Sequence, residues 1–195
     1  MPDYGDHEAT DDLLQILRHS TAHLLAAAVT ELYPGAKYAI GPAIKEPPGF
    51  YYDFDFGKPI SEADLPAIES RMRKIAQEGR KFEHEVLPRD EAIEEFRKRR
   101  QDYKLELIND KVSGDGVSLY RTGDFLDLCL GPHVKSTSEL KAFRLQRVSG
   151  FLFTMICPHF LASGAQGPQR LRRSALRALV CELASLREFF LVRQS

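Results

Sequence analysis

The stretch Asp12-Leu-Leu-Gln-Ile-Leu-Arg-His19-Ser-Thr-Ala-His23-Leu-Leu-Ala-Ala-Ala28 holds the pattern around which we expect the fold to be built. Its leucines recur with the period of an α-helix, which predicts a helix over residues 12–33 with a core-facing stripe. His19 and His23 lie on the opposite side, and side chains four residues apart in a helix point the same way. Small or apolar residues share that side: Ile16, Ala26, Ala27 and Thr30. We therefore expect this side to be covered too, with room beside the imidazoles.

A second pair with the same spacing, Cys129-Leu-Gly-Pro-His133, could bring a thiol and a third imidazole to the same place. A single histidine or cysteine is more often a packing residue than a ligand, but two such pairs favour a shared site. The set His19, His23, Cys129 and His133 is suited to tetrahedral Zn²⁺, and four protein ligands would make a closed, structural site. Without a metal, the same groups could bind and polarise a water for hydrolysis.

Two charged residues are weaker candidates for the same chemistry. Asp127 stands two residues before Cys129 on one side of a predicted strand, so it could orient an imidazole or hold a substrate amine. Lys104 could stabilise a developing oxyanion. From spacing alone, a surface or structural charge is a better interpretation of Asp127 and Lys104 than a functional role.

Composition narrows the class of protein. The chain of 195 residues is 43% apolar and 28% charged, which is typical of a soluble globular protein. A net charge of -1 gives no general basic field, and the basic run at residues 97–100 fits a solvated helix face better than an RNA patch. Three cysteines without paired spacing, a polar N-terminus and no apolar run long enough for a bilayer predict a cytoplasmic protein with no membrane contact.

The remaining pattern predicts an α+β fold, with helices packed on an antiparallel or mixed sheet. Strands are predicted at residues 38–44, 50–56, 82–87, 117–121, 124–130 and 140–148, and helices at residues 61–79 and 88–100. Residues 102–109 fit either a helix or a strand. In the second strand, Tyr52 shares the inward face with Phe50, Phe54 and Phe56.

The chain divides into three parts. Residues 1–11 are expected to be frayed or disordered, residues 12–150 to form the domain, and residues 151–195 to form an atypical tail. The tail has six arginines, no lysine and only two acidic residues, and its leucine spacing predicts an amphipathic helix at residues 168–192. Because no matching apolar surface is evident in the domain, we expect the tail to add little to the fold.

Five motifs in residues 13–150 belong together. They are His19-Ser-Thr-Ala-His23-Leu-Leu-Ala, Ile40-Gly41-Pro42, Gly49-Phe-Tyr-Tyr52-Asp-Phe-Asp55, Tyr103-Lys104 and Asp127-Leu-Cys129-Leu-Gly131-Pro132-His133-Val134. In order and spacing they closely resemble the editing domain of bacterial threonyl-tRNA synthetase. The related alanyl-tRNA synthetase domain shares the two pairs of residues spaced four apart, but the sequence around Tyr52 and Cys129 resembles the threonyl branch.

The resemblance implies hydrolysis of misacylated seryl-tRNA(Thr), with the acceptor end of tRNA(Thr) as partner. It implies catalytic roles for His19, His23, Lys104, Cys129 and His133, and substrate-binding roles for Tyr52 and Asp127. It favours a metal-free mechanism without a cofactor, in which Lys104 and either His19 or His133 position the water, and the ribose hydroxyl shares in proton transfer. The alternatives are a structural zinc-binding or inactive fragment and an alanyl-type trans-editing deacylase.

The chain also departs from the family pattern. The family's N-terminal ubiquitin-like domain and ATP-binding ligase domain have no counterpart, and full-length members form homodimers through a domain missing here. The loop at residues 45–48 is longer than usual, and after Gly150 the chain reads Phe-Leu-Phe-Thr where the family has an Ala-Tyr-Trp-Arg-Gly-like segment. We therefore expect a truncated fragment, with an out-of-frame tail and no ligase activity.

Overall fold

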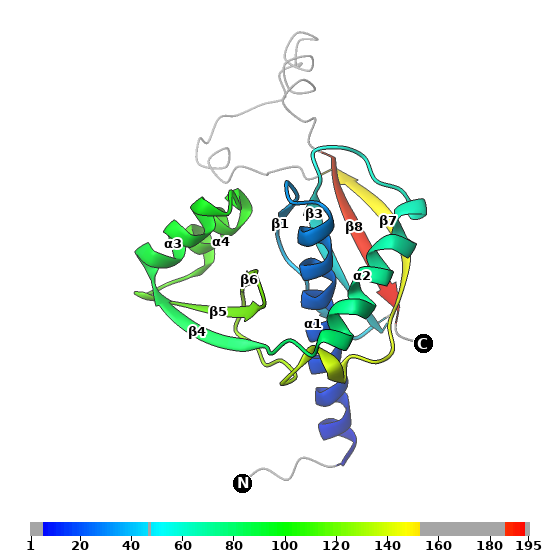
Figure 1. Cartoon of the computed structure of the whole chain (residues 1–195). Helices are drawn as coiled ribbons and strands as arrows, with labels where there is room; N and C mark the ends of the chain where they lie inside the picture. The colour runs from blue at the N-terminus through cyan, green and yellow to red at the C-terminus, as the bar shows by residue number, and fades with distance from the viewer. Residues whose placement is uncertain (1–5, 47, 153–185, 194–195) are drawn as a thin grey trace, which may run out of the picture.

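A computed structural model describes residues 6–46, 48–152 and 186–193 (Figure 1). The helices are α1 (Asp6–Leu32), α2 (Leu65–Glu78), α3 (Arg89–Lys98) and α4 (Asp102–Lys111), with 3₁₀ turns η1 (Glu62–Asp64) and η2 (Thr137–Glu139). The strands are β1 (Lys37–Tyr38), β2 (Ala43–Ile44), β3 (Gly49–Asp55), β4 (Glu83–Pro88), β5 (Gly116–Thr122), β6 (Phe125–Leu128), β7 (Arg144–Leu152) and β8 (Leu186–Arg193). The predicted α+β class is confirmed, and the strand pairs in these ranges are antiparallel.

Helix α1 is the central element, and both sides of its middle are covered as predicted, whereas Leu13 and Leu32 of the predicted core stripe are 54% and 41% exposed. The stretch from Ala22 to Val29 is buried throughout, including Ala26 and Ala27 on the side of the histidines. The start of the helix differs from the prediction, because α1 begins at Asp6 rather than near residue 12. Acidic residues at a helix start complement the positive end of its dipole, which explains why this polar segment continues the helix.

Strand β3 carries the apolar face on which α1 packs. Phe50, Tyr52 and Phe54 are at most 1% exposed, so the predicted inward orientation of Tyr52 is confirmed. The strand predicted at residues 38–44 is instead split into β1 and β2, both paired with β3. Gly41 and Pro42 explain the break: an added Cβ at Gly41 would overlap the Tyr52 ring, and proline has no N–H for a ladder.

The strands form two sheets rather than the single sheet that was predicted. The first has the order β1-β3-β8-β7, with β2 also on β3, and α1 and α2 pack together on it (Figure 1). The second has the order β4-β5-β6; α3 packs on it, and α4 packs on α3 and contributes Ile108 to the same core. It closes separately because it has its own apolar core: Ala92, Phe96, Ile108, Val117, Leu119 and Leu126. Residues 102–109, ambiguous in the sequence, lie in helix α4.

The two halves meet along α1, where the predicted site residues lie. Strand β6 contacts α1, and α4 contacts β1. The end of β6, the face of α1 and the middle of β3 are therefore brought to one seam. Among the described residues, no helix combines the length and apolar character that crossing a membrane requires.

The structure differs from the expected loose tail at residues 186–193. This segment forms β8 between β3 and β7, so the end of the helix predicted at residues 168–192 is a strand, and the rest of that helix lies outside the described residues. Its aromatic and β-branched composition suits a strand. The backbone groups that β3 and β7 direct toward each other are paired through β8, which gives the segment a structural reason to be there.

Removing β8 should therefore lower the melting temperature. A chain ending at Leu152 leaves the facing edges of β3 and β7 without ladder partners. We expect calorimetry to show a fall of roughly 10 °C, which corresponds to about 3 to 5 kcal/mol in a chain of this size. A chain ending at Arg193 keeps the strand and should melt like the full chain. Equal melting of both truncated chains would show that β8 does not stabilise the sheet.

Candidate functional site

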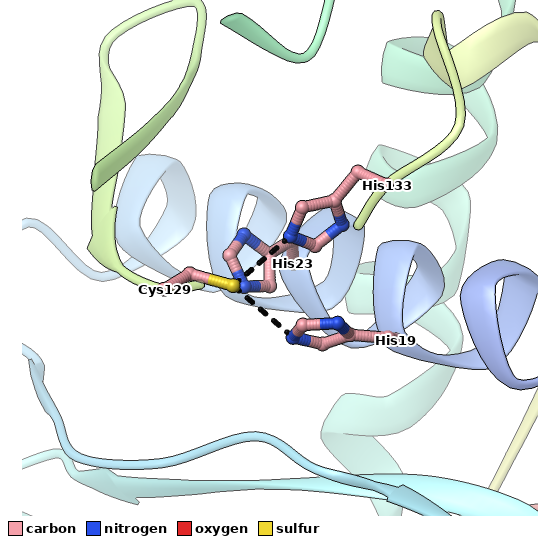
Figure 2. Close-up of side chains that lie close together, drawn as sticks. All are labelled: His19, His23, Cys129 and His133. Atoms are coloured by element: carbon pink, nitrogen blue, oxygen red, sulfur yellow. Dashed lines mark hydrogen bonds between the residues drawn. The ribbon is translucent and has the colours of Figure 1, made fainter. Parts of the chain in front are cut away.

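The structure brings the two predicted pairs together at the seam (Figure 2). One possible ligand atom from each of His19, His23, Cys129 and His133 lies within 4.8 Å of the others. The Cys129 Sγ lies 3.4 Å from Nε2 of His19 and 3.3 Å from Nε2 of His133. The two histidines on α1 thus face the loop after β6, as their spacing predicted.

The backbone of that loop explains how Cys129 and His133 reach α1. Gly131 has a φ of 72°, which a residue with a side chain rarely adopts, and a Cβ there would overlap the Tyr120 hydroxyl. Its N–H points back at the Cys129 Sγ at 3.2 Å. Glycine at this position therefore lets the chain turn tightly enough to present both ligands to one point.

His133 is fixed by contacts on several sides. Its ring stacks on Phe82, with centroids 5.0 Å apart and planes 6° apart, and Tyr120 meets it edge-on. Ser20 Oγ lies 3.0 Å from Nδ1 of His133 and accepts a hydrogen bond from the Val134 N–H at 3.0 Å. Ser20 is visible in the sequence between the two α1 histidines, whereas Phe82 carries no local signal because only the tertiary fold brings it here.

A buried ion pair lies next to this group. Lys104 Nζ contacts Asp127 Oδ1, and both side chains are at most 3% exposed. The Tyr52 hydroxyl donates to Asp127 Oδ2 at 2.5 Å, and Nε2 of His23 lies 3.3 Å from the same oxygen. The Lys104 ammonium also donates to the Ala39 carbonyl and lies 3.4 Å from the Tyr52 hydroxyl. The structure thus joins all seven predicted residues in one continuous cluster.

The position of Lys104 bears on its expected role. An ammonium has three N–H donors, and three protein oxygens surround this one. Its charge therefore acts on the site from behind Asp127 rather than from a free position at the surface. That charge adds to the lowering of the His23 pKa, which burial mainly causes, and partly opposes the rise that burial causes in the pKa of the Cys129 thiol.

Burial keeps the imidazoles neutral. It lowers the pKa of His23 well below 6.5 and that of His133 to about 2. Burial also lowers the pKa of His19, although the Asp127 carboxylate and a hydrogen bond with the Pro132 backbone act against that shift. The thiol responds in the opposite sense, because burial raises the pKa of Cys129 to about 12. At neutral pH the group therefore consists of uncharged imidazoles and a protonated thiol.

A hollow of about 350 Å³ opens beside the cluster. Its walls come from α1, from the start of β2 with the residue before it, and from the loop after β6: Gln15, Ile16, His19, Pro42, Ala43, Gly131 and Pro132. Of the four possible ligands only His19 lines this hollow, so a molecule that entered here would meet His19 first.

The four side chains fit a zinc ion. Ligand distances of about 2.0–2.3 Å around a tetrahedral ion put neighbouring ligand atoms roughly 3.3–3.8 Å apart, close to the two sulfur–nitrogen distances found here. The buried Nδ1 of His23 makes no hydrogen bond within the described residues, so this nitrogen is available as a ligand. Zinc would require loss of the Cys129 proton.

The basic run at residues 97–100 does not join the site. Arg97 pairs with Glu94 at 2.8 Å, while Lys98 and Arg99 pair with Glu95 at 3.5 and 3.4 Å. These contacts within one helix fit the predicted solvated face.

The neutral histidines should make the protein sensitive to acid. His23 and His133 have lowered pKa values in the folded state, so below about pH 6.5 the unfolded chain binds protons that the folded chain does not. The free energy of unfolding should therefore fall as pH drops from 6.5 to 5, by up to about 1.4 kcal/mol per pH unit and histidine. Urea unfolding across this range measures the slope, and His133→Gln should reduce it. A flat profile for the unchanged chain would contradict buried neutral imidazoles.

Comparison with known proteins gives these motifs a family. Residues 117–151 match the family described as the threonyl and alanyl tRNA synthetase second additional domain. Threonine–tRNA ligase of Acetivibrio thermocellus is 54% identical over 133 residues, covering 68% of this chain and 21% of that protein. The enzyme of Methylibium petroleiphilum is 52% identical over 139 residues (71% and 22%), and that of Marinobacter nauticus 47% over 143 residues (73% and 22%). The chain spans about a fifth of the length of these relatives. It belongs to the second additional domain family of threonyl- and alanyl-tRNA synthetases, and the threonine–tRNA ligases are its relatives within that family.

Proposed function

We propose that this chain hydrolyses the ester bond of misacylated seryl-tRNA(Thr). The observation that carries the proposal is the convergence of His19, Cys129 and His133 with the buried Lys104–Asp127 pair beside an open hollow. The names of the relatives support a tRNA substrate. In the reaction, a water oxygen bonds to the ester carbonyl carbon, the ester C–O bond breaks, and serine and deacylated tRNA leave. The proton taken from water ends on the ribose oxygen.

The Lys104 ammonium is assigned to electrostatic stabilisation. The attacked carbonyl gains negative charge, and a fixed cation in a water-poor site stabilises that charge more than it would in bulk water. Asp127 keeps Lys104 in place and offers its carboxylate to the seryl ammonium, while the Tyr52 hydroxyl fixes the carboxylate. These assignments follow the resemblance, and the contacts among the three residues support them.

His19 is the better candidate for binding the attacking water. It lines the hollow, whereas His133 is held between Phe82, Tyr120 and Ser20. A general base works best when its pKa lies near the working pH. Burial takes the pKa of His133 down to about 2 despite the opposing charge of Asp127, whereas at His19 both Asp127 and a hydrogen bond with the Pro132 backbone oppose the effect of burial. We therefore assign the role of proton acceptor to His19, with the ribose hydroxyl as a proton relay. His133 is assigned the role of aligning Cys129.

The need for such a site follows from the small difference between serine and threonine. One methyl group is worth only about 1 to 3 kcal/mol in a binding pocket, or roughly 10- to 200-fold in selectivity. A second site that lacks room for this methyl raises the selectivity further. The seam is closely packed at Tyr52, where even a Cβ on Gly41 would overlap the ring, and this supports a pocket that admits serine and excludes threonine.

Structural zinc binding is the second candidate, and the ligand-like distances around Cys129 favour it. His19, His23, Cys129 and His133 would hold the ion. A zinc ion can act as a Lewis acid, but four protein ligands would complete its tetrahedral shell, so the ion would stabilise the fold.

The first test is deacylation of seryl-tRNA(Thr) by the full chain, with threonyl-tRNA(Thr) as the matched substrate. We expect the seryl ester to be cleaved and the threonyl ester to be spared. Lys104→Met and His19→Ala should each slow cleavage by about 10²-fold or more, the usual scale for loss of an electrostatic or proton-transfer group. Val86→Ala is the control, because Val86 lies on β4 with 59% of its surface exposed and should leave the rate unchanged. Absence of seryl-tRNA(Thr) cleavage by the unchanged chain would refute the proposal.

The second test separates the water mechanism from zinc. Chain treated with a chelator and shown by elemental analysis to be free of metal should retain its deacylation rate. Added zinc should inhibit by occupying His19 and Cys129. Complete loss of activity on chelation, with recovery in zinc alone, would replace the metal-free mechanism by a zinc-dependent one.

A further inference from the structure

Gln101 is the residue that joins the two halves of the protein next to Lys104. It lies between α3 and α4, three residues before Lys104, and its side chain is buried at 6% exposure. Its backbone accepts hydrogen bonds from the N–H groups of Lys104 at 3.0 Å and Leu105 at 3.3 Å. The first turn of the helix that carries the ammonium is therefore anchored at Gln101.

The side-chain amide of Gln101 extends this anchor across the seam to β1. Its Oε1 accepts from the Tyr38 N–H at 3.0 Å, and its Nε2 donates to the Ala36 carbonyl at 3.1 Å. The second amide hydrogen is directed to the Arg99 carbonyl at 3.3 Å. The orientation of the amide is fixed by its partners, because a backbone N–H needs an acceptor and a carbonyl needs a donor.

The segment that Gln101 holds is the one that surrounds the ammonium. The Tyr38 ring lies 5.2 Å from Lys104 Nζ, and the next residue, Ala39, accepts a hydrogen bond from that nitrogen. The Tyr38 hydroxyl also donates to the Leu126 carbonyl at 2.7 Å, in the residue before Asp127. The position of Lys104 relative to the Ala39 carbonyl, the Tyr38 ring and the Asp127 carboxylate thus depends on how α4 packs against β1.

We infer that Gln101 is a positioning residue for the deacylation reaction, acting through Lys104. This inference rests on the proposed function. Gln101 does not line the hollow beside His19 and takes no part in bond making. Its amide holds α4 in register with β1, so that the ammonium remains against Asp127 while charge develops on the substrate. A shift of about 1 Å in such a group can cost 10²-fold in rate.

The test is a double-mutant cycle between Gln101 and Lys104. Gln101→Met keeps the length of the side chain and removes its hydrogen bonds. It should lower the single-turnover rate by about 10- to 100-fold, with little change in the seryl-tRNA(Thr) concentration that gives half of the maximal rate. In a Lys104→Met background the same change should cost less than about 3-fold, because the group that it positions is gone. Gln101→Glu keeps the acceptor for Tyr38 but places a carboxylate oxygen against the carbonyls of Ala36 and Arg99, so it should slow the reaction at least as much as Gln101→Met.

Lys37→Met provides the matched control. Lys37 pairs with Asp102 across the same seam, but both side chains are well exposed, so its loss should leave the rate within about 2-fold. Equal fold losses from Gln101→Met in both backgrounds, or a loss confined to the melting temperature, would overturn the inference. Inactivity of the unchanged chain would instead refute the proposed function, so the two failures are distinct.

Discussion

The buried ion pair between Lys104 and Asp127 is the contact on which the rest of the structure depends. Taking two charges out of water costs several kcal/mol for each ion, and their attraction offsets that cost only where further hydrogen bonds satisfy both groups. Here those bonds come from the Ala39 carbonyl and the Tyr52 hydroxyl. The contributing elements are α4, β6, β3 and the segment after β1. Lys104 and Asp127 belong to the same half of the protein, whereas Ala39 and Tyr52 belong to the other, so sliding along the seam would remove both hydrogen bonds from a buried ion pair.

The same pair contributes to the chemistry of the histidines on α1. Burial is the largest cause of the lowered pKa at both imidazoles, and His23 is buried more completely than His19. The Lys104 charge adds to the lowering at His23, whereas the Asp127 charge partly opposes the effect of burial on His19. The less buried of the two imidazoles borders the hollow. The difference between the neighbouring histidines thus comes first from burial, and the ion pair adds to it.

The sequence predicted the local parts of this arrangement better than the distant ones. Four-residue spacing on a helix and in a glycine turn identified His19 and Cys129 with their partners, because that geometry is set by neighbouring residues. The same spacing could not place Lys104, because its partners Asp127, Tyr52 and Ala39 lie in three other segments of the chain. The second sheet and β8 were missed for the same reason. Alternation shows which face of a strand is buried, but it does not show which strand lies beside it.

The thiol proton connects the two candidate functions. Cys129 binds zinc only as a thiolate, yet burial raises the pKa of this thiol to about 12. The metal would have to displace that proton, whereas His23 could bind through its unpartnered Nδ1 and keep the contact of its Nε2 with Asp127. In the arrangement described here the thiol is instead a neutral neighbour of two imidazole nitrogens, and the Gly131 N–H already occupies one side of its sulfur. Burial therefore favours a protonated thiol beside uncharged imidazoles, although the Gly131 N–H acts in the other direction at the sulfur. An uncharged imidazole is the form of histidine that can accept a proton from water.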